Sequence, residues 1–174
     1  MATTTSMIVA AAKRARGYSD KLLQDIRPEQ FARKPVLGGK VIDTNHPAFV
    51  YGHLALYPAR LMRTIGLDGE AVAAPAAWTD ILKAGTPCHD DPEGKIYPPM
   101  REITAAYARG YDAAIAAVEK LDDAVLSNPT PDERFRETFP VVGGALIMLL
   151  CNHIGMHMGQ VSAWRRCMGL GSVM

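Results

Sequence analysis

Two histidines, His153 and His157, interrupt an apolar stripe near the C-terminus of the chain. They are four residues apart, so on an α-helix they lie on one face, one turn above the other. The same face carries, at the spacing typical of a buried amphipathic helix, Leu146, Leu149, Leu150, Gln160, Val161, Trp164 and Met168. An unsatisfied buried polar group costs about 1–3 kcal/mol. Both imidazoles therefore need partners inside the protein.

Four long amphipathic segments predict an all-α four-helix bundle that forms one domain over residues 1–174. The first begins at Thr5 or Ser6 and extends to about Ile26. The second begins at Pro47, with His46 as the predicted N-cap, and ends before Gly66. The third begins at Pro98-Pro99 and continues to Leu121 or Val125, and the fourth extends from about Pro140 to about Met168.

The connections between these helices differ in length. Residues 27–43 form a predicted loop, and no alternation long enough for a β-strand is present. Pro58 lies inside the second helix and predicts a kink one turn after His53. Residues 68–99 are rich in Pro, Gly and Asp, with a short helix expected around 78–84. This long crossover between the second and third helices is expected to pack across one end of the molecule, either as a lid over a site or as an ordered connection.

The composition excludes several classes of function. The net charge is +1 without a block of like charges, so neither a nucleic-acid partner nor a membrane surface is indicated. The longest apolar run, 141–151, is shorter than the roughly 20 residues of a spanning helix. The three cysteines follow no zinc or disulfide spacing and suit a reducing compartment. We therefore expect a cytoplasmic protein.

Helix geometry selects a third histidine to join the pair. His46 and His53 are seven residues apart, about 10.5 Å along a helix axis, so both cannot ligate the ion that His153 and His157 would hold. His53 lies within the apolar stripe of the second helix, whereas His46 lies at the helix end. His53 is the expected third ligand.

Three neutral imidazoles from two helices suit nickel, zinc, cobalt or iron(II) and leave coordination positions open for water or substrate. The long helices carry no Glu-x-x-His motif, which argues against a ferritin-like di-iron centre. The alternative is a buried cluster of hydrogen-bonded histidines without metal. The spacing by itself leaves both alternatives open.

Two segments carry a family resemblance, residues 45–54 (NHPAFVYGHL) and residues 153–160 (HIGMHMGQ). Together they resemble the DinB superfamily of small four-helix bundles, which includes the DinB and YfiT-like proteins. The resemblance implies an unusual helix order and a metal triad of His53, His153 and His157. Gln160 and the pair Arg165-Arg166 are also typical of the family, whereas the long crossover and His46 are less typical.

The resemblance implies a divalent metal ion (Ni, Zn or Fe(II)) and a metal-dependent transferase that uses a low-molecular-weight thiol as co-substrate. A bound metal lowers the pKa of a thiol and holds it as a nucleophilic thiolate. The family also contains stress-associated proteins of unknown activity. The alternative is therefore a non-catalytic bundle that binds a metal or a ligand.

Other residues have weaker signals. Gln160 and Tyr57 are candidates for contact with the ligands or with substrate, although a core tyrosine is an equal expectation for Tyr57. Residues 88–91 (Cys-His-Asp-Asp) could ligate a metal, but neighbouring loop residues seldom complete a site. Arg60, Arg63, Arg165 and Arg166 are expected on solvated helix faces, with attraction of an anionic thiol as the alternative. Apolar residues and methionines at the surface would suit a homodimer.

Overall fold

The computed structural model describes residues 2–173. Its α-helices are α1 (Thr4–Leu22), α2 (Pro47–Ala55), α3 (Pro58–Thr64), α4 (Thr79–Leu82), α5 (Met100–Val118), α6 (Glu133–Arg136), α7 (Val142–Ile147) and α8 (His153–Cys167), with a π-helical turn, Met148–Asn152, between α7 and α8. Short 3-10 turns cover Pro28–Gln30, Glu70–Val72, Ala76–Trp78 and Asp123–Ser127. Two strands, β1 (Val36–Leu37) and β2 (Lys40–Val41), form a hairpin.

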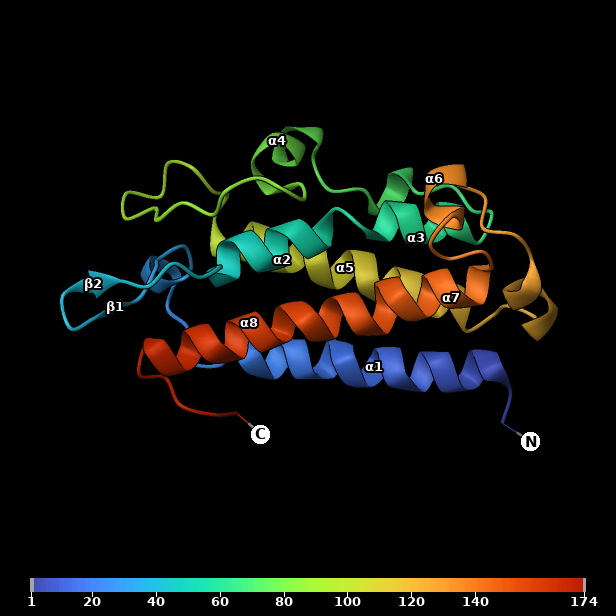
Figure 1. Cartoon of the computed structure of the whole chain (residues 1–174), viewed down its shortest axis with the longest axis horizontal. Helices are drawn as coiled ribbons and strands as arrows, with labels where there is room; N and C mark the ends of the chain where they lie inside the picture. Colours follow the sequence, from blue (N-terminus) through green and yellow to red (C-terminus); the bar gives the residue numbers. More distant parts are fainter. Residues whose placement is uncertain (1, 174) are drawn as a thin grey trace.

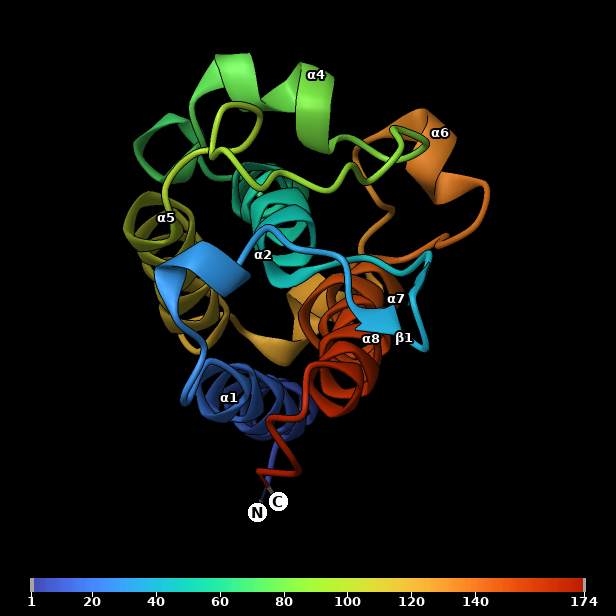
Figure 2. The ribbon, with the colours of Figure 1, turned by 90° about the vertical axis from the view of Figure 1, so that its left-hand side faces the viewer.

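Four helical columns form the bundle: α1, α2 with α3, α5, and α7 with α8 (Figures 1 and 2). Around the ring, α1 contacts α8, α8 contacts α2, α2 contacts α5, and α5 contacts α1. α1 and α8 run in one direction, and α2 and α5 run in the other (Figure 1). The predicted all-α bundle is confirmed, and its helix order makes α8 a direct neighbour of α2.

α1 is shorter than predicted at its C-terminal end. Thr3 caps its first turn by accepting a hydrogen bond from the Ser6 N–H at 3.1 Å. The helix ends at Leu22 instead of Ile26, because Asp25 takes a left-handed conformation with φ of 61° that stops the helix. Ile26 is nevertheless buried, so the apolar stripe predicted the core contact correctly but not the end of the helix.

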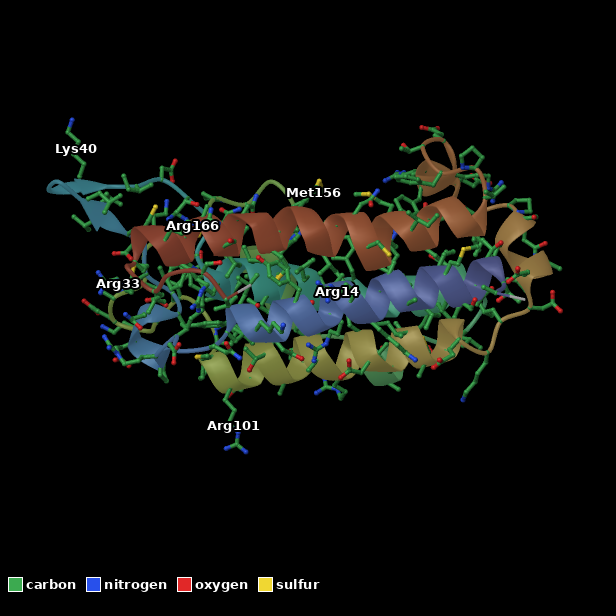
Figure 3. All side chains as sticks on the ribbon, turned by 90° about the horizontal axis from the view of Figure 1, so that it is seen from below. Arg14, Arg33, Lys40, Arg101, Met156 and Arg166 are labelled. Carbon is green, nitrogen blue, oxygen red and sulfur yellow. The ribbon has the colours of Figure 1, made fainter. Side chains whose placement is uncertain are left out.

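Arg165 stabilises this helix end from α8. Its side chain is 1% exposed, and its guanidinium donates to the carbonyl oxygens of Leu22, at 3.0 Å, and of Gln24. The last carbonyls of an α-helix have no partner within the helix and carry partial negative charge. The expectation of a solvated face for Arg165 was wrong, whereas Arg166 is exposed (Figure 3).

The second predicted helix is broken at Pro58. α2 ends at Ala55 and α3 begins at Pro58, which lacks the N–H that would continue the hydrogen-bond ladder. The Leu54 carbonyl instead accepts a hydrogen bond from the Tyr57 N–H at 3.1 Å. The expected kink is therefore a complete interruption one turn after His53.

The connection between α1 and α2 contains a structure that the sequence analysis missed. β1 and β2 pair antiparallel through Gly38 and Gly39, whose φ angles of 56° and 78° suit a tight hairpin turn. Strands of two residues are too short to show alternation. The hairpin protrudes at one end of the molecule (Figure 1).

The long crossover between α3 and α5 lies along the outside of α2 (Figure 2). Its predicted short helix is present as a 3-10 turn followed by α4, which contacts α2. Asp91 organises the following loop by accepting hydrogen bonds from the backbone N–H groups of Lys95, Ile96 and Tyr97 at 2.9–3.0 Å. The segment is therefore an ordered connection that packs along the outside of α2, and not across one end of the molecule as expected.

The column of α7 and α8 is apolar along much of its length. By length and composition, Val142–Cys167 could cross a membrane, although the sequence analysis predicted no such segment. In the bundle its residues Leu150, Ile154 and Trp164 are 0% exposed, and α8 packs against α1 and α2. A helix buried in the core of a soluble protein has the same apolar character. We therefore interpret this stretch as a core helix.

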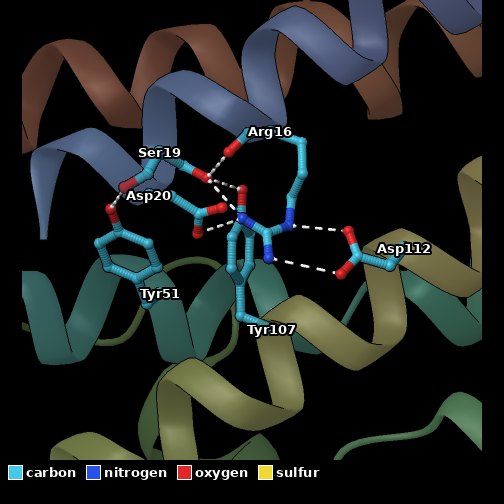
Figure 4. Close-up of polar contacts among 6 residues, drawn as sticks. All are labelled: Arg16, Ser19, Asp20, Tyr51, Tyr107 and Asp112. Atoms are coloured by element: carbon cyan, nitrogen blue, oxygen red, sulfur yellow. Dashed lines mark hydrogen bonds and ion pairs between the residues drawn. The ribbon is translucent and has the colours of Figure 1, made fainter.

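A buried polar cluster joins α1, α2 and α5 (Figure 4). The Tyr51 hydroxyl donates to the Ser19 carbonyl at 2.5 Å, and the Tyr107 hydroxyl donates to Ser19 Oγ at 3.0 Å. Arg16 lies over the Tyr107 ring and forms an ion pair with Asp112 at 3.1 Å. Because Tyr51 and His53 are two residues apart on α2, they face different sides. The cluster thus fixes the rotation of the helix that carries His53.

His46 is the N-cap of α2, as predicted, and it is fully buried. Its Nδ1 accepts a hydrogen bond from the Phe49 N–H at 3.2 Å, and its Nε2 lies 2.7 Å from the carbonyl oxygen of His89. The carbonyl needs a donor, so the neutral Nε2–H form fits both partners. Burial lowers the pKa of His46 from 6.5 to about 4, since the charged ring would lose its hydration.

This depressed pKa predicts acid lability. Between pH 6.5 and 4 the unfolded chain binds a proton at this residue that the folded chain does not, so stability is present above pH 6.5 and falls on acidification. From pH 7 to pH 5 the loss at His46 is expected to be about 2 kcal/mol. Urea unfolding of the metal-free protein measures it. His46→Asn keeps a capping oxygen and should give a pH dependence shallower by about one proton; an unchanged slope would contradict this account.

Candidate metal centre

His53, His153 and His157 meet between α2 and α8, as the sequence analysis predicted. His153 Nε2 lies 3.3 Å from His53 Nε2 and 3.2 Å from His157 Nε2. One ligand atom of each ring lies within 4.8 Å of the other two. Nitrogens bound to one ion at about 2.0–2.1 Å are separated by about 2.9–3.4 Å in octahedral or tetrahedral geometry. The two separations from His153 match that range.

His53 is positioned by a helix that is buried on all sides. Its Nδ1 lies 2.7 Å from the Leu82 carbonyl oxygen at the end of α4, so this nitrogen carries the proton and donates. Leu82 reaches this place because Gly52 has no side chain: a Cβ there would lie 2.6 Å from Leu82 Cδ1. The crossover thereby orients the His53 ring, which the sequence analysis did not foresee.

His157 is oriented by Gln160. Its Nδ1 lies 2.9 Å from Gln160 Oε1, which also accepts a hydrogen bond from Asn45 Nδ2 at 3.2 Å. The contact of Gln160 with a ligand was predicted from the spacing of three residues. The hydrogen bond from Asn45 to Gln160 was not predicted, because it requires the N-terminus of α2 to lie close to α8.

His153 follows directly after the π-helical turn Met148–Asn152. A π-helical turn inserts one extra residue into a helix and often occurs at functional sites. Here it sets the rotation of α8, which brings His153 Nε2 within 3.3 Å of the Nε2 atoms of both other rings. Its Nδ1 is buried without a hydrogen-bond partner among the described residues.

The proton positions test whether the site suits a metal. His53 and His157 each donate from Nδ1, so both direct an unprotonated Nε2 toward His153. His153 can place one proton on its own Nε2 and donate it to one of these two nitrogens. The Nε2 lone pair of the remaining ring, His53 or His157, then has no hydrogen-bond donor. A divalent cation would satisfy all three lone pairs, so the donor set fits a metal ion better than a closed hydrogen-bonded cluster.

The electrostatics keep the three ligands neutral. Burial lowers the pKa of His53 and of His157, and burial together with the two neighbouring imidazoles lowers the pKa of His153 to about 3. A ligating imidazole must be unprotonated. The site is therefore ready to bind a cation near neutral pH.

Aromatic side chains enclose the triad. The Tyr57 ring lies 4.4 Å from the His153 ring and 5.1 Å from the His53 ring, measured between centroids, and Phe49 stacks parallel to His53 at 6.3 Å. Burial raises the pKa of the Tyr57 hydroxyl. The sequence placed Tyr57 near the site correctly, and the structure shows that its ring covers the ligands.

The remaining candidate residues make contacts with other groups of the protein. His46 caps α2, and Asp90 forms an ion pair with Arg33 at 2.9 Å. Arg60 forms an ion pair with Asp132 at 2.8 Å and lies over the Phe135 ring. Trp164 packs in the core and donates from Nε1 to the Arg33 carbonyl at 2.7 Å.

The fold and the site together define a class of protein. It is a four-helix bundle in which three neutral histidines, from two neighbouring helices, form a site that can hold a divalent metal. A family model described as the DinB superfamily matches residues 11–161, which is most of the chain, and the chain belongs to this superfamily. The match confirms the resemblance to this superfamily that the sequence indicated. No curated protein matches the chain.

Proposed function

We propose that the protein is a metal-dependent transferase that joins a small thiol to an electrophilic substrate. The proposal is supported by the three Nε2 atoms of His53, His153 and His157, which face one another on neutral rings. When bound there, a divalent ion would lower the pKa of the thiol and supply a thiolate near neutral pH. In the reaction the thiol loses its proton, its sulfur forms a bond to carbon, and the leaving group departs with the electron pair.

The residues around the triad have separate tasks in this proposal. Three neutral imidazoles bring no charge of their own, so they leave the full charge of the ion available to the thiol. The Leu82 carbonyl and Gln160 hold the rings of His53 and His157 in position. The rings of Tyr57 and Phe49 exclude water from one side of the triad and so strengthen the electrostatic interactions inside it. We place this activity in the cytoplasm, where small thiols stay reduced.

Metal reconstitution tests the proposal. The protein is stripped with a chelator, reloaded with nickel, zinc or iron(II) without oxygen, and supplied with a small thiol and a generic alkylating electrophile. We expect thiol consumption to need the metal, to be absent in His157→Ala and to be unchanged in His89→Ala, whose side chain is exposed. Stoichiometric metal without any metal-dependent rate would instead identify a non-catalytic metal-binding bundle.

A further inference from the structure

A polar cavity of about 610 Å³ lies next to the metal centre, on the side of His157 that carries Nδ1. The base of the hairpin, the crossover loop 86–89 and α8 line it. None of the three histidines of the triad is among its lining residues, and their Nε2 atoms meet on the far side of the His157 ring. The cavity is therefore separate from the position that a metal would take, and its volume accommodates a small molecule.

The residues that line the cavity carry hydrogen-bond donors that the protein itself uses little. Gln160 accepts through Oε1 from His157 Nδ1 and from Asn45 Nδ2, whereas its own amide N–H groups have no acceptor among residues 2–173. The Lys34 ammonium is paired with Asp43, whose side chain is 95% exposed. An ion pair with so exposed a carboxylate contributes little. Donors without strong acceptors favour an anionic ligand, because hydrogen bonds to a charged acceptor are the stronger ones.

Gln160 belongs both to the cavity and to the metal centre. Its Oε1 lies 2.9 Å from His157 Nδ1 and orients the His157 ring. Loss of such an orienting contact typically lowers metal affinity 10- to 100-fold. An acceptor bound to the Gln160 N–H groups would polarise the amide and make Oε1 a stronger acceptor, since hydrogen bonds in a chain reinforce one another. A ligand in the cavity would therefore strengthen the contact that orients His157.

We propose that this cavity is an effector site for a small carboxylate, which is held by the Lys34 ammonium and the Gln160 amide and tightens the metal centre through His157. A carboxylate has two acceptor oxygens, so it can serve an ammonium and an amide at once. The inference adds regulation to the site of the proposed function; it rests on the metal centre of that proposal but not on the transfer reaction. Because coupling between two binding sites is reciprocal, the metal must raise the affinity for the carboxylate by the same factor.

Titration of the metal-free protein with carboxylates tests the effector site. Acetate, propionate and butyrate are each compared with the uncharged amide of the same chain length, and the NMR signals of the Asn45 and Gln160 side-chain amides report binding. The carboxylate should bind about tenfold more tightly than the amide, as a charged hydrogen bond predicts. Lys34→Gln should remove this preference. Lys40→Gln removes the same charge at the hairpin tip, where Lys40 projects into solvent (Figure 3), and should keep the preference.

Zinc affinity, measured by competition with a metal-binding dye, tests the coupling. A saturating carboxylate should raise the zinc affinity of the wild-type protein about threefold, which is part of the 10- to 100-fold that an orienting contact contributes. Zinc should raise the affinity for the carboxylate by the same factor. Lys34→Gln in the same solutions corrects for zinc held by free carboxylate. Gln160→Glu keeps an acceptor for His157 but has no N–H for the ligand, so it should still bind zinc and lose both the carboxylate and the coupling.

The possible results separate this inference from the proposed function. Equal affinities for carboxylates and amides, a preference that persists in Lys34→Gln, or a wild-type zinc affinity that no carboxylate changes would overturn the inference. A wild-type protein that binds no zinc, nickel or iron(II) would instead refute the proposed function and with it the coupling. In that case a carboxylate preference of the metal-free protein would still identify the cavity as an anion site.

Discussion

His153→Ala is expected to abolish stoichiometric metal binding. His153 is the central residue of the triad, because its Nε2 lies within 3.3 Å of the Nε2 atoms of both other rings. Loss of a group that merely orients a ligand typically lowers metal affinity 10- to 100-fold, so loss of a ligand should lower it by about 100-fold or more. Elemental analysis and competition with a metal-binding dye measure this change.

Metal-induced stabilisation provides a second readout that does not depend on activity. Metal at about 100 times its dissociation constant should stabilise the wild-type protein by about 2.7 kcal/mol, and the same concentration should stabilise His153→Ala hardly at all. Gln160→Ala keeps all three ligands but frees the His157 ring, so its affinity should fall about tenfold. His89→Ala is the matched control with an exposed imidazole. Wild-type affinity in His153→Ala would refute the site.

Arg165→Met is expected to give the largest loss of stability, about 3 kcal/mol. The substitution keeps a long, flexible side chain but removes the donors to the carbonyls of Leu22 and Gln24, and these charged hydrogen bonds hold the end of α1 against α8. A buried charge can sometimes be replaced by an apolar side chain at little cost. Here the carbonyls would remain behind without their donor, which makes the replacement unfavourable.

Arg166→Met is the matched control, because Arg166 is the exposed neighbour of Arg165 on the same helix. It should change the free energy of unfolding by no more than about 0.5 kcal/mol. For a chain of this size the difference corresponds to a midpoint temperature about 10 °C lower for Arg165→Met. Equal thermal unfolding of the two variants would show that Arg165 does not support the end of α1.

Much of the site could be predicted from residue spacing. The pair His153 and His157 and the neighbouring Gln160 share one helix, so their relative positions follow from 3.6 residues per turn. His53 could be selected over His46 by the same geometry, and the proline after His46 predicted the N-cap. These inferences succeeded because each depends on contacts within one helix.

The groups that orient the ligands could not be predicted in the same way. The Leu82 carbonyl and the Asn45 amide reach the triad from segments far away in the sequence. Arg165 was expected in solvent because it stands beside Arg166, but its side chain lies under the end of α1. No periodic pattern in the sequence records such contacts between separate segments.

The sequence by itself determined the helical class, the apolar faces and the three histidines that lie on those faces, because local periodicity fixes which side chains share a face. The tertiary structure decided how those faces meet. It placed α8 beside α2, set the rotation of α8 through the π-helical turn and that of α2 through the Tyr51 hydroxyl, and left two unprotonated nitrogens facing His153. The physical reason is that a metal centre needs ligand positions defined to fractions of an ångström. Only the packing of the whole bundle supplies that precision.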